Sequence, residues 1–241
     1  MCTVSFFYLG ENDFILTSNR DEAIGRQTIP PNIRKLKGVN VLAPQDKIAN
    51  GTWIGVSDKS RLLCLLNGAY EKHKRTPPYR KSRGVIVNDL LVVDDVVSAL
   101  ENYDFEGIEP FTLLILDWVS NLKLYEVVWD GEIAYFNKLP LIPMIWCSST
   151  LYTAEMKAIR NQWFSNFQKN NAVNIESIFD FHENYGVGDK DIDLQIDRGL
   201  LKTVSVTSVS KKAAEINMKY KDLLQDEVYI SSFNSYTIAN E

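Results

Sequence analysis

The hydrophobic pattern of the N-terminus predicts a β-hairpin. Residues 3–9 (TVSFFYL) are rich in β-branched and aromatic types, residues 10–13 (GEND) are typical of a turn, and residues 14–18 (FILTS) form a second apolar run. Four polar residues, 19–22 (NRDE), follow directly. Because a hairpin folds back on itself, we expect these four residues to lie beside the start of the first strand.

The rest of the chain alternates between short apolar runs and turn residues, which predicts a mostly antiparallel protein. Strands are expected over residues 39–43, 52–57, 61–66, 111–118, 122–129, 132–138, 203–209 and 228–233. Helical spacing of apolar residues predicts a helix over 85–103, and further helices are expected over 153–168, 175–184 and 213–224. Loops are expected over 29–32 and 68–84. No regular strand–helix–strand alternation appears, so we expect one α+β domain over residues 1–241 with helices on the outer faces of antiparallel sheets.

Charge and cysteine content narrow the class of protein. The 241 residues carry a net charge of −5 and give a pI of about 5.2, so the basic footprint of a nucleic-acid-binding protein is absent. The longest uncharged stretch, residues 139–154, contains Pro140 and Pro143, and it is too short and too broken for a membrane span. Three cysteines without a CxxC spacing make no disulfide framework, and no secretory leader is visible. We therefore expect a cytoplasmic protein with no integral membrane segment and no nucleic-acid partner.

Cys2 is the first candidate for chemistry. Removal of Met1 would leave a thiol and a free α-amine on one residue, and an amine with a pKa of about 7.7–8.0 can take the proton of the thiol. An arginine such as Arg20 stabilises a neighbouring thiolate, and Asp21 can hold an ammonium group or orient a substrate amine. The alternatives are a small buried residue at position 2 and a helix cap or solvated turn at residues 19–22.

Several motifs together carry a family resemblance. They are Met1-Cys2, the NRDE quartet at residues 19–22, LAPQD at 42–46, GTWIG at 51–55 and Leu66-Asn67. With them the chain resembles the NRDE family, also called the transport and Golgi organisation 2 family, most densely over residues 1–85. That family is similar to the N-terminal-nucleophile hydrolases, in particular the branch of penicillin V acylase and bile salt hydrolase. The resemblance implies a four-layer αββα sandwich of two antiparallel sheets, with the nucleophile at the edge of a central strand.

The resemblance also implies roles for single residues. Cys2 matches the nucleophile, Arg20 and Asp21 match the polar pair beside it, and Asn67 is placed to donate to an oxyanion. Family members often have Asn-Ser where this chain has Ser148 after Cys147, so Ser148 has to serve in place of an oxyanion-hole asparagine. Losing one such donor typically costs about 2.7–4 kcal/mol of transition-state stabilisation.

A second departure lies near the C-terminus. Many members read Thr-Arg-Ser where this chain reads Thr203-Val204-Ser205, so a catalytic arginine of the acylase branch is missing.

Other residues are candidates for ligand binding. A basic loop contains Arg80 and Arg83 and can guide an anionic ligand such as a phosphate, a CoA moiety or a propionate, although it can equally be a solvated loop that balances nearby acids. Trp53 lies in a glycine-flanked strand, where it lines either a pocket or the core. We place Asn19, Glu22, Trp53, Arg80, Arg83 and Ser148 at the ligand site. No paired histidines, Cys/His cluster or glycine-rich phosphate loop occurs, so neither a metal nor a cofactor is expected.

These observations leave three hypotheses. The first is an N-terminal-nucleophile hydrolase that cleaves a non-peptide linear amide through Cys2. The second is a non-catalytic binding or trafficking protein for haem or for an acyl-CoA-like or lipid-like anionic ligand, which is a role that the resemblance implies only loosely. The third is an interaction module without a small ligand. In the first two, the partner is a small molecule that is anionic or contains an amide.

Overall fold

The structure is a computed structural model that describes residues 3–234. Its internal contacts divide the chain into two compact units. We call residues 1–26 with 142–241 the terminal unit and residues 27–141 the middle unit.

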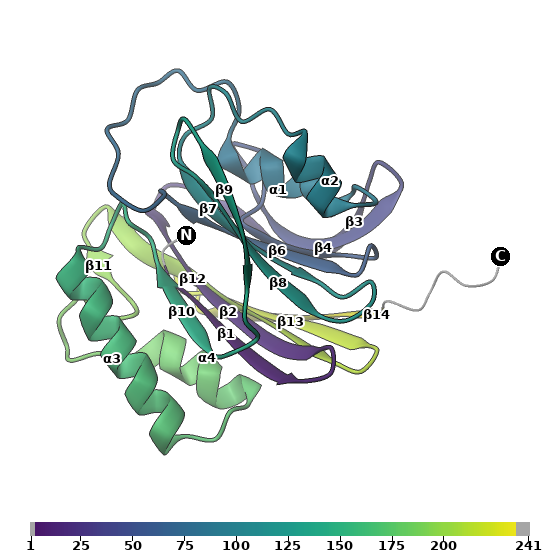
Figure 1. Ribbon diagram of the computed structural model, residues 1–241. Coiled ribbons are helices and arrows are strands. Elements are labelled where there is room, and N and C mark those ends of the chain that lie inside the picture. The colour runs from purple at the N-terminus through teal and green to yellow at the C-terminus, as the bar shows by residue number, and fades with distance from the viewer. Residues whose placement is uncertain (1–2, 235–241) are drawn as a thin grey trace. The chain divides into compact units, whose positions relative to one another are not determined.

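In the terminal unit, the strands form one antiparallel sheet whose order is β10-β1-β2-β12-β13-β14, with the short β11 beside β12 (Figure 1). Its elements are β1 (Thr3–Gly10), β2 (Asp13–Ala23), β10 (Met144–Cys147), α3 (Ala154–Asn170), α4 (Ile175–Asn184), β11 (Asp197–Arg198), β12 (Leu201–Lys212), β13 (Glu215–Asp222) and β14 (Glu227–Asn234). The opening hairpin is therefore central, because β12 pairs with the far side of β2.

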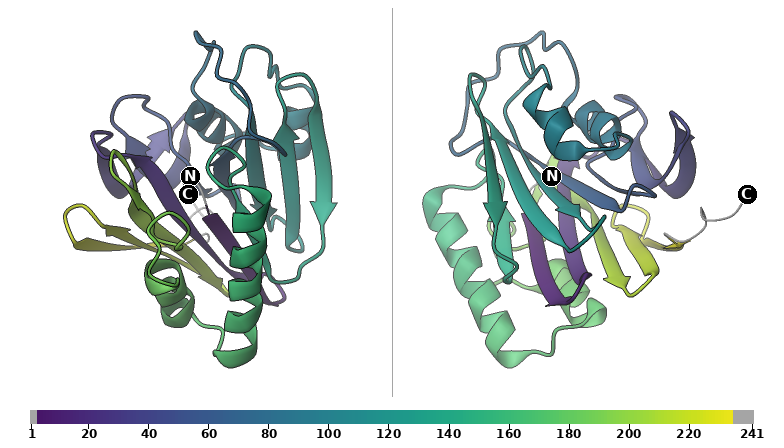
Figure 2. Two further views of the ribbon diagram at one scale, coloured as in Figure 1. Left: turned by 90° about the vertical axis from the view of Figure 1, so that its left-hand side faces the viewer. Right: turned by 45° about the vertical axis from the view of Figure 1, so that its right-hand side comes forward.

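Helices α3 and α4 lie against the sheet near β1, β2 and β10 (Figures 1 and 2). Phe7 and Ile15, which are opposite each other in the hairpin, pack against Trp163 and Phe167 of α3 and against Phe181 of α4. Both helices also start with a good cap: the Thr153 hydroxyl accepts from the Met156 N–H, and Asn174 forms a capping box with Ser177.

The middle unit is a second antiparallel sheet, in which each strand pairs with its neighbour in the sequence from β3 to β9. Its elements are β3 (Thr28–Leu36), β4 (Val39–Asp46), β5 (Ile54–Ser57), β6 (Arg61–Asn67), α1 (Arg83–Leu91), α2 (Val96–Glu101), β7 (Phe111–Asp117), β8 (Lys123–Trp129) and β9 (Ala134–Leu139). Each unit thus supplies one antiparallel sheet and one helical layer, which confirms the α+β class.

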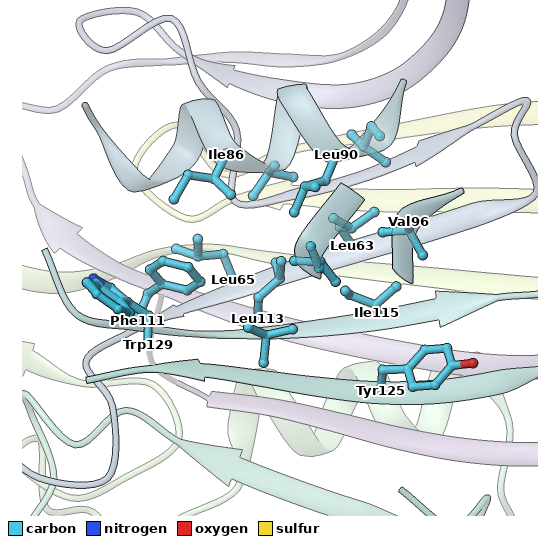
Figure 3. Close-up of a cluster of buried hydrophobic side chains, with 14 of the residues drawn as sticks. Leu63, Leu65, Ile86, Leu90, Val96, Phe111, Leu113, Ile115, Tyr125 and Trp129 are labelled. Atoms are coloured by element: carbon cyan, nitrogen blue, oxygen red, sulfur yellow. The ribbon is translucent and has the colours of Figure 1, made fainter. Parts of the chain in front are cut away.

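The core of the middle unit lies between its sheet and the helices α1 and α2. Ile86 and Leu90 of α1 point toward Leu63, Leu65 and Leu113 on the central strands (Figure 3). Fully burying one such side chain contributes about 1.5–3 kcal/mol, so this layer is held by hydrocarbon packing.

Most of the expected elements are present. The hairpin of β1 and β2, the meander of β7, β8 and β9, and the helices α3 and α4 confirm the predictions within a few residues. The polar quartet, however, belongs to β2 itself, because that strand extends to Ala23 and pairs with β12 as far as its end.

Three local predictions are wrong. Residues 213–224 contain strand β13 in place of a helix, because Ile216, Met218 and Tyr220 alternate with polar residues at a period of two and are the buried ones. The helix expected over 85–103 is two helices, since the Asp95 carboxylate accepts from two N–H groups at the start of α2. The loop expected over 29–32 lies in β3, where an edge strand tolerates prolines.

Among residues 3–234, no helix has both the length and the apolar character needed to cross a bilayer.

Candidate functional site

The candidate site lies at the open end of the β1–β2 hairpin. Thr3 is directly opposite Asn19, so the polar quartet begins at the level of the first described residue of β1. Cys2, the expected nucleophile, lies outside the described residues. The hairpin therefore brings Thr3, the next residue in the chain, to the quartet.

Side chains of the quartet alternate between the two faces of β2, as they must in a strand. Asn19 and Asp21 face the helical layer, where their side chains bond to His182 and Tyr152. Arg20 is on the opposite face with Glu22, and its Nη2 is 3.8 Å from Glu22 Oε2. The structure therefore separates the side chains of Arg20 and Asp21, which were expected to act as one pair.

Asp21 is buried and held by two hydroxyl groups. The Tyr152 hydroxyl donates to Oδ2 and the Thr203 hydroxyl donates to Oδ1, both at 2.6 Å. Thr203 Oγ1 also accepts from the Ile196 N–H at 2.9 Å. Both hydroxyl groups therefore donate to the carboxylate, one to each of its oxygens.

Arg160 of α3 connects this carboxylate to the start of β1. Its Nη1 donates to Thr3 Oγ1 at 2.5 Å, and its other donors bond to the carbonyl oxygens of Ile192 and Asp193. The guanidinium carbon lies 3.7 Å from the centre of the Tyr152 ring, whose hydroxyl bonds to Asp21. Burial by itself lowers the pKa of Arg160, but its interactions with Tyr152, Cys147 and Asp21 raise it overall, so the group stays charged.

His182 of α4 fixes the other side of the hairpin. The Asn19 amide nitrogen donates to the backbone oxygens of His182 and Leu194, which leaves Asn19 Oδ1 as an acceptor, 2.6 Å from His182 Nδ1. We therefore assign the proton to Nδ1, and Nε2 accepts from the Ser5 hydroxyl at 2.7 Å. Burial, together with the charge of Arg160, lowers the pKa of His182 to about 3, so the ring is neutral.

Strand β10 brings Cys147 and Ser148 to the same end of the hairpin. Cys147 is directly opposite Thr3, and burial raises the pKa of its thiol. Ser148 comes next and is almost fully buried; its hydroxyl bonds to Thr150, and its carbonyl oxygen accepts from the Tyr152 N–H. The position that was expected to replace an oxyanion-hole asparagine is therefore close to Thr3 in the sheet.

The second departure from the family pattern also falls at this site. Val204 is the extra residue of an irregularity in β12, because Thr203 is opposite Asp21 and Ser205 is opposite Arg20. Val204 is buried and adds no charge.

The remaining candidates lie in the middle unit. Asn67 is the last residue of β6, and Trp53 is buried. Arg83 bonds to the Glu109 carboxylate at 3.1 Å, and Arg80 forms an ion pair with Asp104. The structure thus engages Arg80 and Arg83 in ion pairs within the unit.

Sequence reasoning missed Arg160, Tyr152, His182 and Thr203. A signal existed for Arg160, which shares the buried stripe of α3 with Trp163, Phe164 and Phe167. A charged residue in an apolar stripe of a helix indicates a buried partner. Among residues 3–234, no group of three or more His, Cys, Asp or Glu side chains could hold a metal ion.

Comparison of the sequence and the structure with known proteins identifies the family of the chain and the fold that it shares with solved structures. The sequence profile described as Transport and Golgi organisation 2 matches residues 1–227. No curated protein matches the sequence.

Among solved structures, the chain is similar to conjugated bile acid hydrolase from Clostridium perfringens, with a TM-score of 0.58 and 11% identity over 97% of this chain and 92% of that one. It is also similar to penicillin V acylase from Agrobacterium tumefaciens, with a TM-score of 0.56 and 12% identity over 95% of this chain and 85% of that one. These likenesses show a shared fold, that of the N-terminal-nucleophile hydrolases.

Proposed function

The chain belongs to the Transport and Golgi organisation 2 family, and from that premise we propose that it hydrolyses a non-peptide linear amide with Cys2 as the N-terminal nucleophile. Its partner is then a small amide-containing molecule. The cytoplasmic location and the absence of a nucleic-acid partner stay predictions.

The observation that carries the proposal is the anchoring of Thr3. Chain ends usually fray, but Thr3 is fully buried, pairs with Asn19 and Cys147, and receives a hydrogen bond from a buried guanidinium. A nucleophile must be held close to its productive position, because small displacements cost large factors in rate. An anchored residue 3 supports such a role for the residue bonded to it.

The proposed reaction has two steps. After removal of Met1, the α-amine of Cys2 takes the thiol proton, and Sγ attacks the amide carbonyl to form a tetrahedral intermediate. The ammonium then protonates the leaving nitrogen, the C–N bond breaks, and a thioester remains. Water, deprotonated by the same amine, attacks the thioester, the C–S bond breaks, and the acid leaves as the thiol is restored.

The described residues have proposed parts in these steps. Asp21, whose carboxylate accepts from the hydroxyl groups of Tyr152 and Thr203, holds the ammonium as its counter-charge. Arg20 stabilises the thiolate, and Ser148 donates to the oxyanion. Glu22 borders the substrate, and the parts expected of Asn19, Asn67 and Trp53 stay predictions.

The second hypothesis, a non-catalytic carrier of haem or of an acyl-CoA-like or lipid-like anionic ligand, receives less support. That hypothesis depends on the basic loop, residues 68–84, whose charges could attract the anionic groups of haem or acyl-CoA. Arg75 and Arg83 both bind Glu109, and Arg80 pairs with Asp104, so each of these three arginines has a carboxylate partner within the middle unit. No contact of the described residues favours the carrier over the hydrolase.

The proposal is tested with two amides, penicillin V and a glycine-conjugated bile acid. We expect purified protein without Met1 to release the amine from at least one of them, and Cys2→Ala to abolish the release. Cys64→Ala is the matched control, because Cys64 is a buried cysteine of the middle unit. Release that persists in Cys2→Ala, or retention of Met1 in every active molecule by intact mass, contradicts the proposal.

A further inference from the structure

The two edge strands of the middle sheet are built differently. At one edge, β3 carries Pro30 and Pro31, which have no N–H group to donate to another strand. At the other edge lies β9 (Figure 1), which has no proline. Its Tyr135 and Phe136 are 38% and 42% exposed. An unprotected, exposed apolar edge is a template for another strand.

The backbone of β9 is available for such pairing. The Asp130 N–H donates to the Ile133 carbonyl oxygen at 3.2 Å across the hairpin. Because hydrogen-bonded and non-bonded pairs alternate in an antiparallel ladder, the backbone groups of Ala134, Phe136 and Lys138 then face away from β8. Among residues 3–234, no strand pairs with β9 on that side.

Apolar surface flanks this edge on both faces. On the face of the helical layer, a cavity of about 340 Å³ is lined by Ala134 and Phe136 of β9, by Val127 of β8 and by residues of α2 and the loop after it. On the other face, the ring of Tyr135 packs against Tyr70, with 5.5 Å between ring centres. An added strand would therefore bury apolar side chains on both faces.

We propose that β9 pairs antiparallel with β9 of a second copy of this chain, with the twofold axis at Tyr135. In this register Ala134 is opposite Phe136 of the second copy, so that a large ring meets a small residue at the mouth of the cavity. Residues with outward backbone groups face each other, as an antiparallel ladder requires. This dimer goes beyond the proposed hydrolysis and does not depend on it.

Charge complementarity indicates that the strand pairing with the edge of β9 comes from a second copy of this chain. Glu132 and Lys138 are both exposed and lie three positions on either side of Tyr135. The twofold register brings Lys138 of each copy to Glu132 of the other, so two opposite-charge contacts form at the ends of the pairing. A strand with opposite charges at symmetric positions is complementary to itself.

The test is the oligomeric state of the full chain, measured by sedimentation equilibrium over a concentration series. We expect a reversible dimer of the wild-type chain. Phe136→Glu should make it monomeric because it places a carboxylate at the centre of the interface. Ile33→Glu is the matched control, since Ile33 is 54% exposed on the protected edge strand, and it should leave the dimer intact.

Charge reversal tests the register. Lys138→Glu should weaken the dimer about tenfold, because two attractive contacts become repulsive. The double variant Glu132→Lys, Lys138→Glu should restore the wild-type affinity. A wild-type chain that stays monomeric, a dimer that survives Phe136→Glu, or a double variant without rescue overturns the proposal. Amide hydrolysis by each variant, measured in parallel, reports on Cys2 separately.

Discussion

Arg61 and Arg160 are both fully buried, one in each unit, and they differ in what they hold. Arg61 donates to the backbone oxygens of Leu90, Val93 and Asp94 at the end of α1 and just beyond it, and forms an ion pair with Asp117. Arg160 donates to backbone oxygens too, but it also bonds to the side chain of Thr3 and lies on the ring of Tyr152.

The difference separates a purely structural buried arginine from one that lies beside the proposed site. Beneath α1 and α2 the layer is hydrocarbon, and Arg61 only fastens a helix end to the sheet. Beneath α3 and α4, hydrocarbon covers the turn end of the β1–β2 hairpin, while polar groups fill its open end around Thr3, Asn19 and Asp21. Buried polar networks are costly unless their hydrogen bonds are satisfied, and this satisfied network holds the end of the hairpin at which we propose the reaction.

Removing Arg160 should have the largest effect. Arg160→Met leaves the Thr3 hydroxyl and two backbone oxygens without their donor, and we expect a loss of about 3–5 kcal/mol in the free energy of unfolding. Urea unfolding measures it. Arg160→Lys should recover only part of the loss, because an ammonium cannot reproduce the forked contacts. A loss below about 1 kcal/mol contradicts this account of the network.

Arg61→Met is the matched change in the middle unit. We expect it to lower the free energy of unfolding by about 2–4 kcal/mol, since three backbone oxygens lose a donor. Under folding conditions, however, the alkylation rate of Cys2 should be unchanged, whereas Arg160→Met should alter it. If Arg61→Met and Arg160→Met changed the alkylation rate of Cys2 equally, the two arginines would not differ in the way described.

His182 gives a pH signature to the terminal unit. The pKa of its ring is about 3 in the folded protein and about 6.5 in the unfolded chain. Between pH 6.5 and pH 3, His182 is therefore protonated in the unfolded chain and neutral in the folded protein. Stability from this residue is therefore fully present above pH 6.5 and declines by about 1.4 kcal/mol per unit as the pH falls toward 3. Unfolding curves at several pH values should show this slope in the wild type and its loss in His182→Gln. The same slope in both proteins would mean that His182 is charged in the fold.

Tyr152→Phe should have the smallest effect. It removes one hydroxyl donor from the Asp21 carboxylate while keeping the ring beneath Arg160, so we expect a loss of about 1.5 kcal/mol. Chemical denaturation checks the magnitude. Thr203→Val removes the other donor and also the acceptor of the Ile196 N–H, so it should cost more than Tyr152→Phe. Unchanged stability of both variants would show that Asp21 does not need the two hydroxyl groups.

The sequence predicts the sheets well because their signals are local. The hairpin of β1 and β2 and the meander of β7, β8 and β9 follow from apolar runs and turn residues. The helix expected over 213–224 is strand β13, in which Ile216, Met218 and Tyr220 alternate with polar residues at the period of a strand. The extension of β2 through the quartet was missed because it depends on pairing with β12, which lies far away in the sequence.

The sequence predicts where the candidate site lies, but it does not predict which side chains surround the quartet. The hairpin turn alone brings the quartet beside the start of β1. That Arg20 and Asp21 face opposite ways follows from the pleat, once the quartet is known to be strand. The partners Tyr152, Arg160 and His182 come from segments more than 100 residues away, and nothing local in the quartet indicates them.

The most direct test of the central claim is the pH dependence of Cys2 alkylation by iodoacetamide, read by peptide mass spectrometry. Cys147 of the same molecules is the internal reference, because burial raises the pKa of its thiol. The account predicts that Cys2, freed of Met1, reacts fastest and with an apparent pKa below the ordinary thiol value of about 8.5. A Cys2 that reacts no faster near neutral pH than an unperturbed thiol would contradict it.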